Sequence, residues 1–239
     1  MNNRRTLIAA IVGGALLLGA AGLGIIYFAV FAGSSPQKLA LSSPTPSTSA
    51  STSQDSSAGA GTWTVGSGSQ AGYRVREKLA ALSAPSDAVG RTTAVTGTFT
   101  LTQAASGYSV TAADITVDVT KLSSDQSRRD QRIHSQGLES DRYPTATFKL
   151  TSPIALTADA TSGQTVHVSA TGDLTIHGVT KSVTIPIDAR LTGSKIELVG
   201  SISFPFSQFG MTPPSIGGFV SVQNTATMEF QLLLTRQGA

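Results

Sequence analysis

Residues 172–185 read Gly172-Asp173-Leu174-Thr175-Ile176-His177-Gly178-Val179-Thr180-Lys181-Ser182-Val183-Thr184-Ile185. Apolar and polar residues alternate along this stretch on both sides of a short polar turn. Successive side chains of a strand point to opposite faces, so the alternation predicts two antiparallel strands that each bury one face. The His-Gly pair between them indicates a tight hairpin turn.

The same alternation recurs along most of the chain. It predicts eight strands, at residues 62–75, 91–101, 113–119, 145–150, 166–176, 183–191, 196–204 and 222–234. Short connections such as residues 192–194 favour antiparallel neighbours. Eight such strands with one apolar face form either a sandwich or a closed barrel, and only the barrel removes exposed edges. Pro186 cannot donate a ladder hydrogen bond, so we expect a bulge or a strand edge there.

Two segments interrupt the strand pattern. Residues 125–138 lack alternation and contain helix-forming Gln, Arg and Leu, which predicts one short helix over an end of the barrel. Residues 204–219 combine four phenylalanines and a methionine with Pro and Gly. This loop either lines an entrance for lipid or forms a small core that closes a barrel end.

The N-terminal part predicts a membrane anchor. Residues 7–32 are almost wholly apolar and would span about 39 Å as a helix, against roughly 30 Å of hydrocarbon. Arg4 and Arg5 precede this run, so residues 1–6 are expected in the cytoplasm and the rest of the chain outside it. The alternative is a cleaved signal peptide and a secreted protein, but the apolar region of such peptides is usually shorter.

Residues 33–61 are rich in Ser, Thr, Ala, Gly and Pro, which predicts a disordered spacer ahead of a barrel domain at residues 62–236. Three of the basic residues lie outside that domain, which leaves 14 basic and 13 acidic residues within it. A nearly neutral domain has no electrostatic footprint for nucleic acid. The chain has no cysteine, which excludes disulfides and thiolate metal sites.

Three stretches resemble the YceI-like family. They are residues 88–97, residues 129–148 with Arg129-Asp130-Gln131-Arg132 and Arg142-Tyr143-Pro144, and residues 172–181. The resemblance covers roughly residues 62–236 and implies an exported, lipocalin-like antiparallel barrel that holds an isoprenoid chain in an apolar channel. Many relatives begin with Trp, Asp and a His-Ser pair, whereas here Trp63 is followed by Gly66, Ser69 and Gln70, so any role of that Asp and His is absent.

Inward positions of the predicted strands are the candidate channel lining. They are Val95, Phe99, Val117, Phe148, Ile176, Ile185, Ile202, Phe204, Met228 and Phe230. Candidate contacts for a phosphate or carbonyl headgroup are Arg128, Arg129, Arg132, Arg142 and His177, since arginine suits such oxygens. No catalytic residue, metal ligand or cofactor site is predicted: the three histidines lack metal spacing, and no serine or threonine has an identifiable base partner.

These observations predict a membrane-tethered protein, not an enzyme, that binds a polyprenyl lipid or an isoprenoid quinone outside the cytoplasm. The sequence identifies no protein partner. Two alternatives stay open at this point. In the first, the domain is an enzyme that acts on an isoprenoid through His177 or the arginines. In the second, it is a filled barrel that serves as a protein-interaction or stress-response module.

Overall fold

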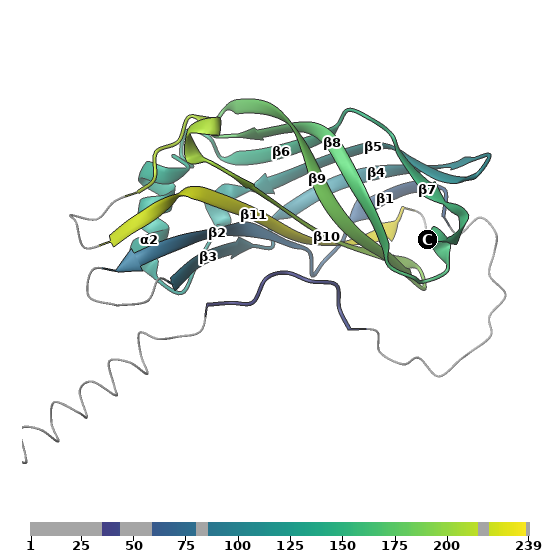
Figure 1. Ribbon diagram of the computed structural model, residues 1–239, viewed down its shortest axis with the longest axis horizontal. Coiled ribbons are helices and arrows are strands. Elements are labelled where there is room, and N and C mark those ends of the chain that lie inside the picture. The colour runs from purple at the N-terminus through teal and green to yellow at the C-terminus, as the bar shows by residue number, and fades with distance from the viewer. Residues whose placement is uncertain (1–34, 44–58, 80–85, 215–219, 238–239) are drawn as a thin grey trace, which may run out of the picture. The chain divides into compact units, whose positions relative to one another are not determined.

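The computed structural model describes residues 35–43, 59–79, 86–214 and 220–237, with the predicted anchor at residues 7–32 outside this part of the chain. The alternating residues form strands of a single antiparallel sheet (Figure 1). The strands are β1 (Gly61–Val65), β2 (Gln70–Leu79), β3 (Ser86–Thr92), β4 (Val95–Ala104), β5 (Gly107–Asp118), β6 (Thr145–Leu150), β7 (Ile154–Thr157), β8 (Val166–Ile176), β9 (Val179–Thr192), β10 (Lys195–Phe204) and β11 (Val220–Arg236).

The sheet closes on itself because β1 pairs with β4 on one side and with β11 on the other. Around the barrel the order is β1, β4, β5, β6, β8, β9, β10 and β11, while β2 and β3 extend the wall from β11. Along the chain, β1 and β2 act as one bent strand, and so do β3 and β4. The prediction of an eight-stranded antiparallel barrel is confirmed, and the sandwich is excluded. The sequence did not predict β7, which pairs only with β5 among the described strands.

The hairpin predicted from residues 172–185 is formed by β8 and β9, which pair from Ile176 and Val179 outward. Both turn residues have positive φ, 53° at His177 and 71° at Gly178. Two-residue hairpin loops favour this mirror-image turn because its twist matches that of the strands.

The predicted edge at Pro186 is present. Pairing between β9 and β10 ends at Ile187 and Gly200, so Pro186 keeps a ladder partner on β8 only. Beyond this point η4 (Phe206–Phe209) packs against β9. Phe209 is fully buried and meets the ring of Phe204 edge to face at 4.7 Å between centroids. The described part of the phenylalanine-rich loop is therefore a small core that closes one end of the barrel.

A helical segment covers the same end, as predicted. It consists of η1 (Val119–Lys121), α2 (Ser127–Arg132) and a π-helical turn η2 (Ile133–Gly137). Of the described helices, none has the length and apolar character needed to cross a bilayer. His134 is held in place by the carbonyl of Leu122 and the hydroxyl of Ser140, at 3.0 and 2.9 Å.

Residues 37–43 differ from the predicted spacer over residues 33–61. They belong to the same compact unit as the barrel and run along its outer wall (Figure 1). Composition alone indicates a spacer there, but hydrogen bonds to side chains on β3, β9, β10 and β11 fix this segment. We call residues 37–43 the strap. At the C-terminal boundary of the predicted spacer, β1 begins at Gly61, one residue before the predicted start of the barrel domain.

Candidate functional site: an apolar cavity inside the barrel

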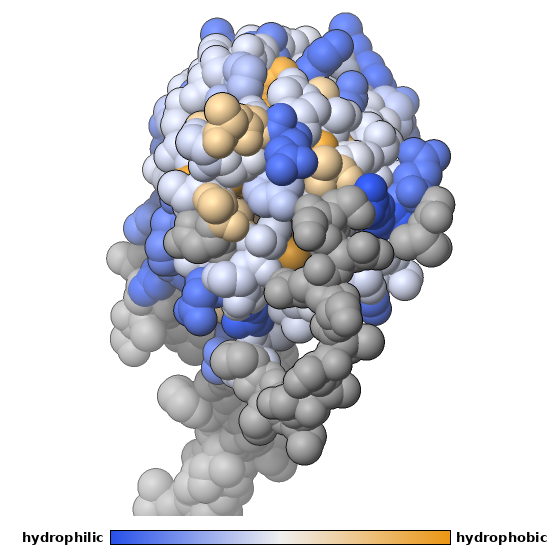
Figure 2. Space-filling model, turned by 90° about the vertical axis from the view of Figure 1, so that its right-hand side faces the viewer, coloured by the Kyte–Doolittle hydropathy of each residue, from blue (hydrophilic) through white to orange (hydrophobic). Residues whose placement is uncertain are grey.

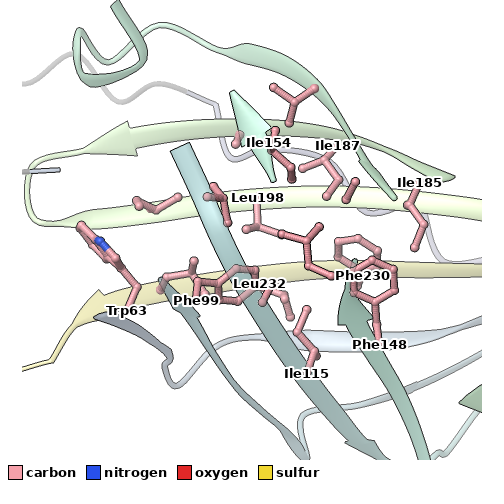
Figure 3. Close-up of a pocket in the computed structure, with 18 of the residues that line it drawn as sticks. Trp63, Phe99, Ile115, Phe148, Ile154, Ile185, Ile187, Leu198, Phe230 and Leu232 are labelled. Atoms are coloured by element: carbon pink, nitrogen blue, oxygen red, sulfur yellow. The ribbon is translucent and has the colours of Figure 1, made fainter. Parts of the chain in front are cut away.

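A partly enclosed cavity of about 150 Å³ lies inside the barrel. A cavity needs roughly 10–15 Å³ of such space to hold a single water, so this cavity has room for several. Its wall is almost wholly apolar, with side chains contributed from all around the barrel (Figure 3). The labelled lining residues are Trp63, Phe99, Ile115, Phe148, Ile154, Ile185, Ile187, Leu198, Phe230 and Leu232. Apolar cavities of this kind stay empty of ordered water and receive apolar ligands.

A second cavity of about 100 Å³ lies toward the helical end. It is lined by Ile133 and Leu138 of the helical segment and by Phe206 and Met211 of the closing loop. Both cavities share the lining residues Ala71, Val117, Ala146 and Met228. The two spaces therefore adjoin within the barrel.

The opposite end of the barrel carries β7, η3 (Ala158–Thr161) and the end of β11. Ala160 and Thr161 of η3 line the first cavity, so the cavity reaches this end. Seen from there, the surface is mostly polar, and apolar residues show only in small separate patches (Figure 2). At this end of the barrel, the apolar side chains therefore line the cavity rather than form a large outer patch.

Three aromatic rings lie against the wall because each faces a glycine on the neighbouring strand. A Cβ built on Gly172 would lie 2.5 Å from the ring of Phe148, and one on Gly200 would lie 2.5 Å from the ring of Phe230. A Cβ on Gly90 would lie 2.3 Å from the ring of Tyr73. An aromatic ring folded over a cross-strand glycine is a known device of β-sheets. Because these glycines have no side chain, the rings can lie against the wall rather than project into the cavity.

Nine of the ten predicted lining residues line a cavity. Val95, Phe99, Val117, Phe148, Ile185, Met228 and Phe230 line the first, and Ile176 and Phe204 line the second. Ile202 lines neither and packs, half-buried, against the core. Contact of these residues with a ligand stays a prediction. Sequence reasoning missed Trp63, Ile115, Leu198 and Leu232, although each occupies an inward position of the same alternation.

Tyr73 was also missed, although it occupies an inward position of β2. Its ring lines the second cavity, while its buried hydroxyl makes no hydrogen bond with the described residues. Burial raises the pKa of Tyr73 well above its usual value, so the hydroxyl keeps its proton. A buried donor without a partner is costly and uncommon in native proteins.

The predicted headgroup residues do not converge on the cavities. Arg129 is mostly buried and pairs with Glu77 at 3.2 Å and with Asp125. Arg142 is exposed, with its guanidinium 5.1 Å from the ring centroid of Tyr143. Arg128 is exposed and Arg132 half-buried on α2. None of these described side chains lines either cavity.

His177 likewise has a structural setting. Its Nε2 lies 2.6 Å from a carboxylate oxygen of Glu139, and its ring packs 4.5 Å from that of Tyr143. The contact ties the β8–β9 turn to the segment that follows the helix. Within the described residues, no group of three or more His, Cys, Asp or Glu is placed to hold a metal ion.

Sequence comparison places this chain among known proteins. A family model described as the YceI-like domain matches residues 63–234, more than half of the chain. A UPF0312 protein of Vibrio parahaemolyticus is 38% identical over 82 residues, which is 34% of this chain and 39% of that protein. The matched segment therefore spans about two fifths of that relative's length.

One solved structure supports the fold, and a second is more distantly similar. A polyisoprenoid binding domain from Saccharophagus degradans, implicated in plant cell wall breakdown, superposes with a TM-score of 0.56 at 14% identity. The match covers 73% of this chain and 98% of that domain. BcnA of Burkholderia cenocepacia gives a TM-score of 0.47 at 19% identity, over 67% of this chain and 95% of that one. The family match runs from Trp63 in β1 to Leu234 in β11 and so takes in the whole barrel wall, and this chain belongs to the YceI-like family.

Proposed function

We propose that the barrel binds the hydrocarbon chain of an isoprenoid lipid, either a polyprenyl lipid or an isoprenoid quinone. The observation that carries this proposal is the pair of adjoining apolar cavities, of about 150 and 100 Å³, enclosed by a closed wall. The Saccharophagus degradans domain of the same fold, which is called polyisoprenoid binding, supports the choice of ligand class. Binding is driven by apolar burial, at about 25 cal/mol per Å² before the costs of ordering.

The cavities also weigh against the two alternatives. A filled barrel acting only through its outer surface is inconsistent with an interior of this size. An enzyme using His177 or the arginines would need these groups to reach the ligand. They lie outside the cavity walls, and Glu139 and Glu77 engage His177 and Arg129.

The proposed site of action is outside the cytoplasm, with residues 7–32 as an uncleaved anchor. The length of the apolar run and the preceding Arg4 and Arg5 support this orientation. Protease treatment of intact spheroplasts tests it: we expect the barrel to be cleaved from the outside and to stay with the membrane before cleavage. A barrel that is released into the medium would instead indicate a cleaved signal peptide.

The ligand proposal is tested by filling the cavity. Ala170 on β8 is buried and lines the first cavity, while its neighbour Ser169 is exposed on the outer face. We expect Ala170→Phe to lower co-purified isoprenoid at least tenfold in native mass spectrometry and lipid extraction, and Ser169→Phe to leave it unchanged. The proposal fails if the unmodified protein carries no isoprenoid and takes none up, or if both variants bind as much as the parent.

A further inference from the structure

The strap makes a set of specific contacts with the outer wall of the barrel. Nη2 of Arg91 on β3 donates to the carbonyl of Gln37, and Nε2 of Gln231 on β11 donates to that of Ala40 at 3.2 Å. Nη2 of Arg190 on β9 donates to the carbonyl of Ser42. The strap thus crosses several strands, and side chains of the wall bind its backbone carbonyls.

Ser42 fixes the C-terminal end of the strap through several hydrogen bonds. Its backbone N–H and its hydroxyl both donate to Oε1 of Glu197 on β10, at 2.9 and 2.8 Å. Gln231 donates to the same carboxylate oxygen at 2.7 Å, and Arg190 pairs with the other oxygen at 3.4 Å. Charge-assisted hydrogen bonds of this kind are the stronger ones in proteins.

The wall beneath the strap is buried although it faces outward. Leu198 lines the cavity, so its neighbours Glu197 and Val199 point to the outside, yet they are only 7% and 8% exposed. Val199 pairs with Gln231 of β11 and lies two residues after Glu197 on β10. An outward valine on a barrel wall needs a cover to be buried, and the strap is hydrogen-bonded to Glu197 and Gln231 beside it.

The strap itself alternates like a strand. Leu39 and Leu41 are half-buried, while Lys38 and Ala40 are exposed. One face of the segment therefore packs toward the barrel and the other faces solvent. A peptide bound through backbone carbonyls and alternate apolar side chains is a common mode of segment recognition.

We infer that the outer face of β3, β9, β10 and β11 is a binding surface for an extended peptide, and that residues 37–43 of this chain occupy it. The surface is distinct from the lipid cavity, since it lies on the other side of the barrel wall. Its principal contacts are Arg91, Arg190, Glu197 and Gln231.

This docking changes which residues tether the barrel. The chain leads from residue 32 to the strap through residues 33–36, which reach at most about 18 Å. A free spacer over residues 33–61 would reach about 100 Å. The Ser/Thr/Pro-rich residues 44–58 then join the strap to β1 and do not set the distance to the anchor. This consequence rests on the proposed anchor, whereas the docking does not.

Thiol protection tests the docking. The chain has no cysteine, so Val199→Cys introduces a single thiol. In the full chain we expect slow labelling by a maleimide reagent. Adding Leu39→Ser and Leu41→Ser should accelerate labelling at least tenfold, whereas the matched pair Lys38→Ser and Ala40→Ser should not. Equal labelling in all three proteins would overturn the inference.

Hydrogen exchange on the unmodified full chain gives a second measurement in case Val199→Cys does not fold. The Ser42 amide should exchange at least tenfold more slowly than an unstructured amide of the same sequence, because it is bonded to Glu197. Exchange at the unstructured rate would contradict docking.

Two insertions test the tether in vesicles. Twelve Gly/Ser residues are placed after Pro36 in one protein and after Ser49 in another, and a dye on Ser194→Cys reports energy transfer to a labelled bilayer. We expect only the first insertion to lower transfer, because only it lies between the strap and residue 32. Equal losses from both would overturn the inference. Failure of every protein to bind vesicles would refute the anchor, and the thiol result would still decide the docking.

Discussion

Tyr73, Phe148 and Phe230 show at the scale of single residues how the barrel stays hollow. Each ring lies over a glycine of the adjacent strand, at Gly90, Gly172 and Gly200 respectively. Interiors are normally close-packed, so a persistent space requires that large side chains be held to the wall. The glycines provide that room, and a Cβ at any of them would push a ring inward.

Gly90→Ala tests this arrangement, because the nearest atoms to its new Cβ all belong to the Tyr73 side chain, at 2.3 to 2.7 Å. Overpacking should lower the free energy of unfolding by about 1–3 kcal/mol. Tyr73→Leu should cost less in the Gly90→Ala background than alone, as the clash is then removed. Urea denaturation of the four proteins measures this coupling, and additive effects would show that the ring and the glycine do not interact.

His177 gives a second prediction at this scale. It combines a left-handed backbone, φ 53°, with a 2.6 Å contact to Glu139. His177→Ala should lower the free energy of unfolding by about 1–2 kcal/mol, from backbone strain and the lost hydrogen bond. His177→Asn should cost less, since Asn tolerates this conformation.

Lipid content separates the structural role of His177 from a catalytic one. We expect both variants and the parent protein to carry equal amounts of isoprenoid and to leave it chemically unchanged. If the parent converts a bound isoprenoid and His177→Ala abolishes that conversion without loss of uptake, the enzyme alternative is correct.

At the scale of elements, the strap adds a pH dependence through Glu197. Burial by itself would raise the pKa of Glu197, but hydrogen bonds from Ser42 and Gln231 and the charge of Arg190 together lower it. A carboxyl with a lowered folded-state pKa stabilises the fold above its unfolded value and loses that contribution as the pH falls through the folded-state value. The strap should therefore loosen below about pH 4.5, the ordinary pKa of the side chain.

Hydrogen exchange of residues 39–42 between about pH 6 and pH 3, corrected for the intrinsic pH effect, measures this loosening. Glu197→Gln should show weaker protection near pH 6 and a flatter dependence on pH. A dependence as steep as that of the parent protein would assign the effect to another carboxylate, of which Glu229 beside Arg91 is the nearest candidate on this wall.

At the scale of the whole molecule, the proposed lipid would add to the stability of the folded protein. A ligand that binds only the folded state adds RT ln(1 + [L]/Kd), about 2.7 kcal/mol at a hundredfold excess over Kd. Extracting the lipid should lower the melting temperature, and adding a polyprenol or a quinone should restore it. Ala170→Phe should abolish the shift, because the new ring occupies the space that the lipid would take. An equal shift in that variant would place the lipid elsewhere.

The sequence by itself determined the eight-stranded antiparallel wall, although not β7, and most of the residues that face inward. All of these follow from a local period of two, broken at turns such as His177-Gly178 and at Pro186. The absence of this alternation over residues 125–138 likewise located the helical segment before β6. The family motifs then favoured a barrel over a sandwich, which alternation alone cannot separate.

Only the tertiary structure decided that the barrel is hollow, because a packed core and a lined channel have the same pattern of apolar residues. The space depends on cross-strand pairs such as Phe230 and Gly200, which lie far apart in the chain. The setting of Arg129 also depended on the tertiary structure, because its partner Glu77 lies 52 positions away in the sequence. The strap is the clearest case, since its composition indicates a free spacer, and its order comes from Glu197, 155 residues after Ser42.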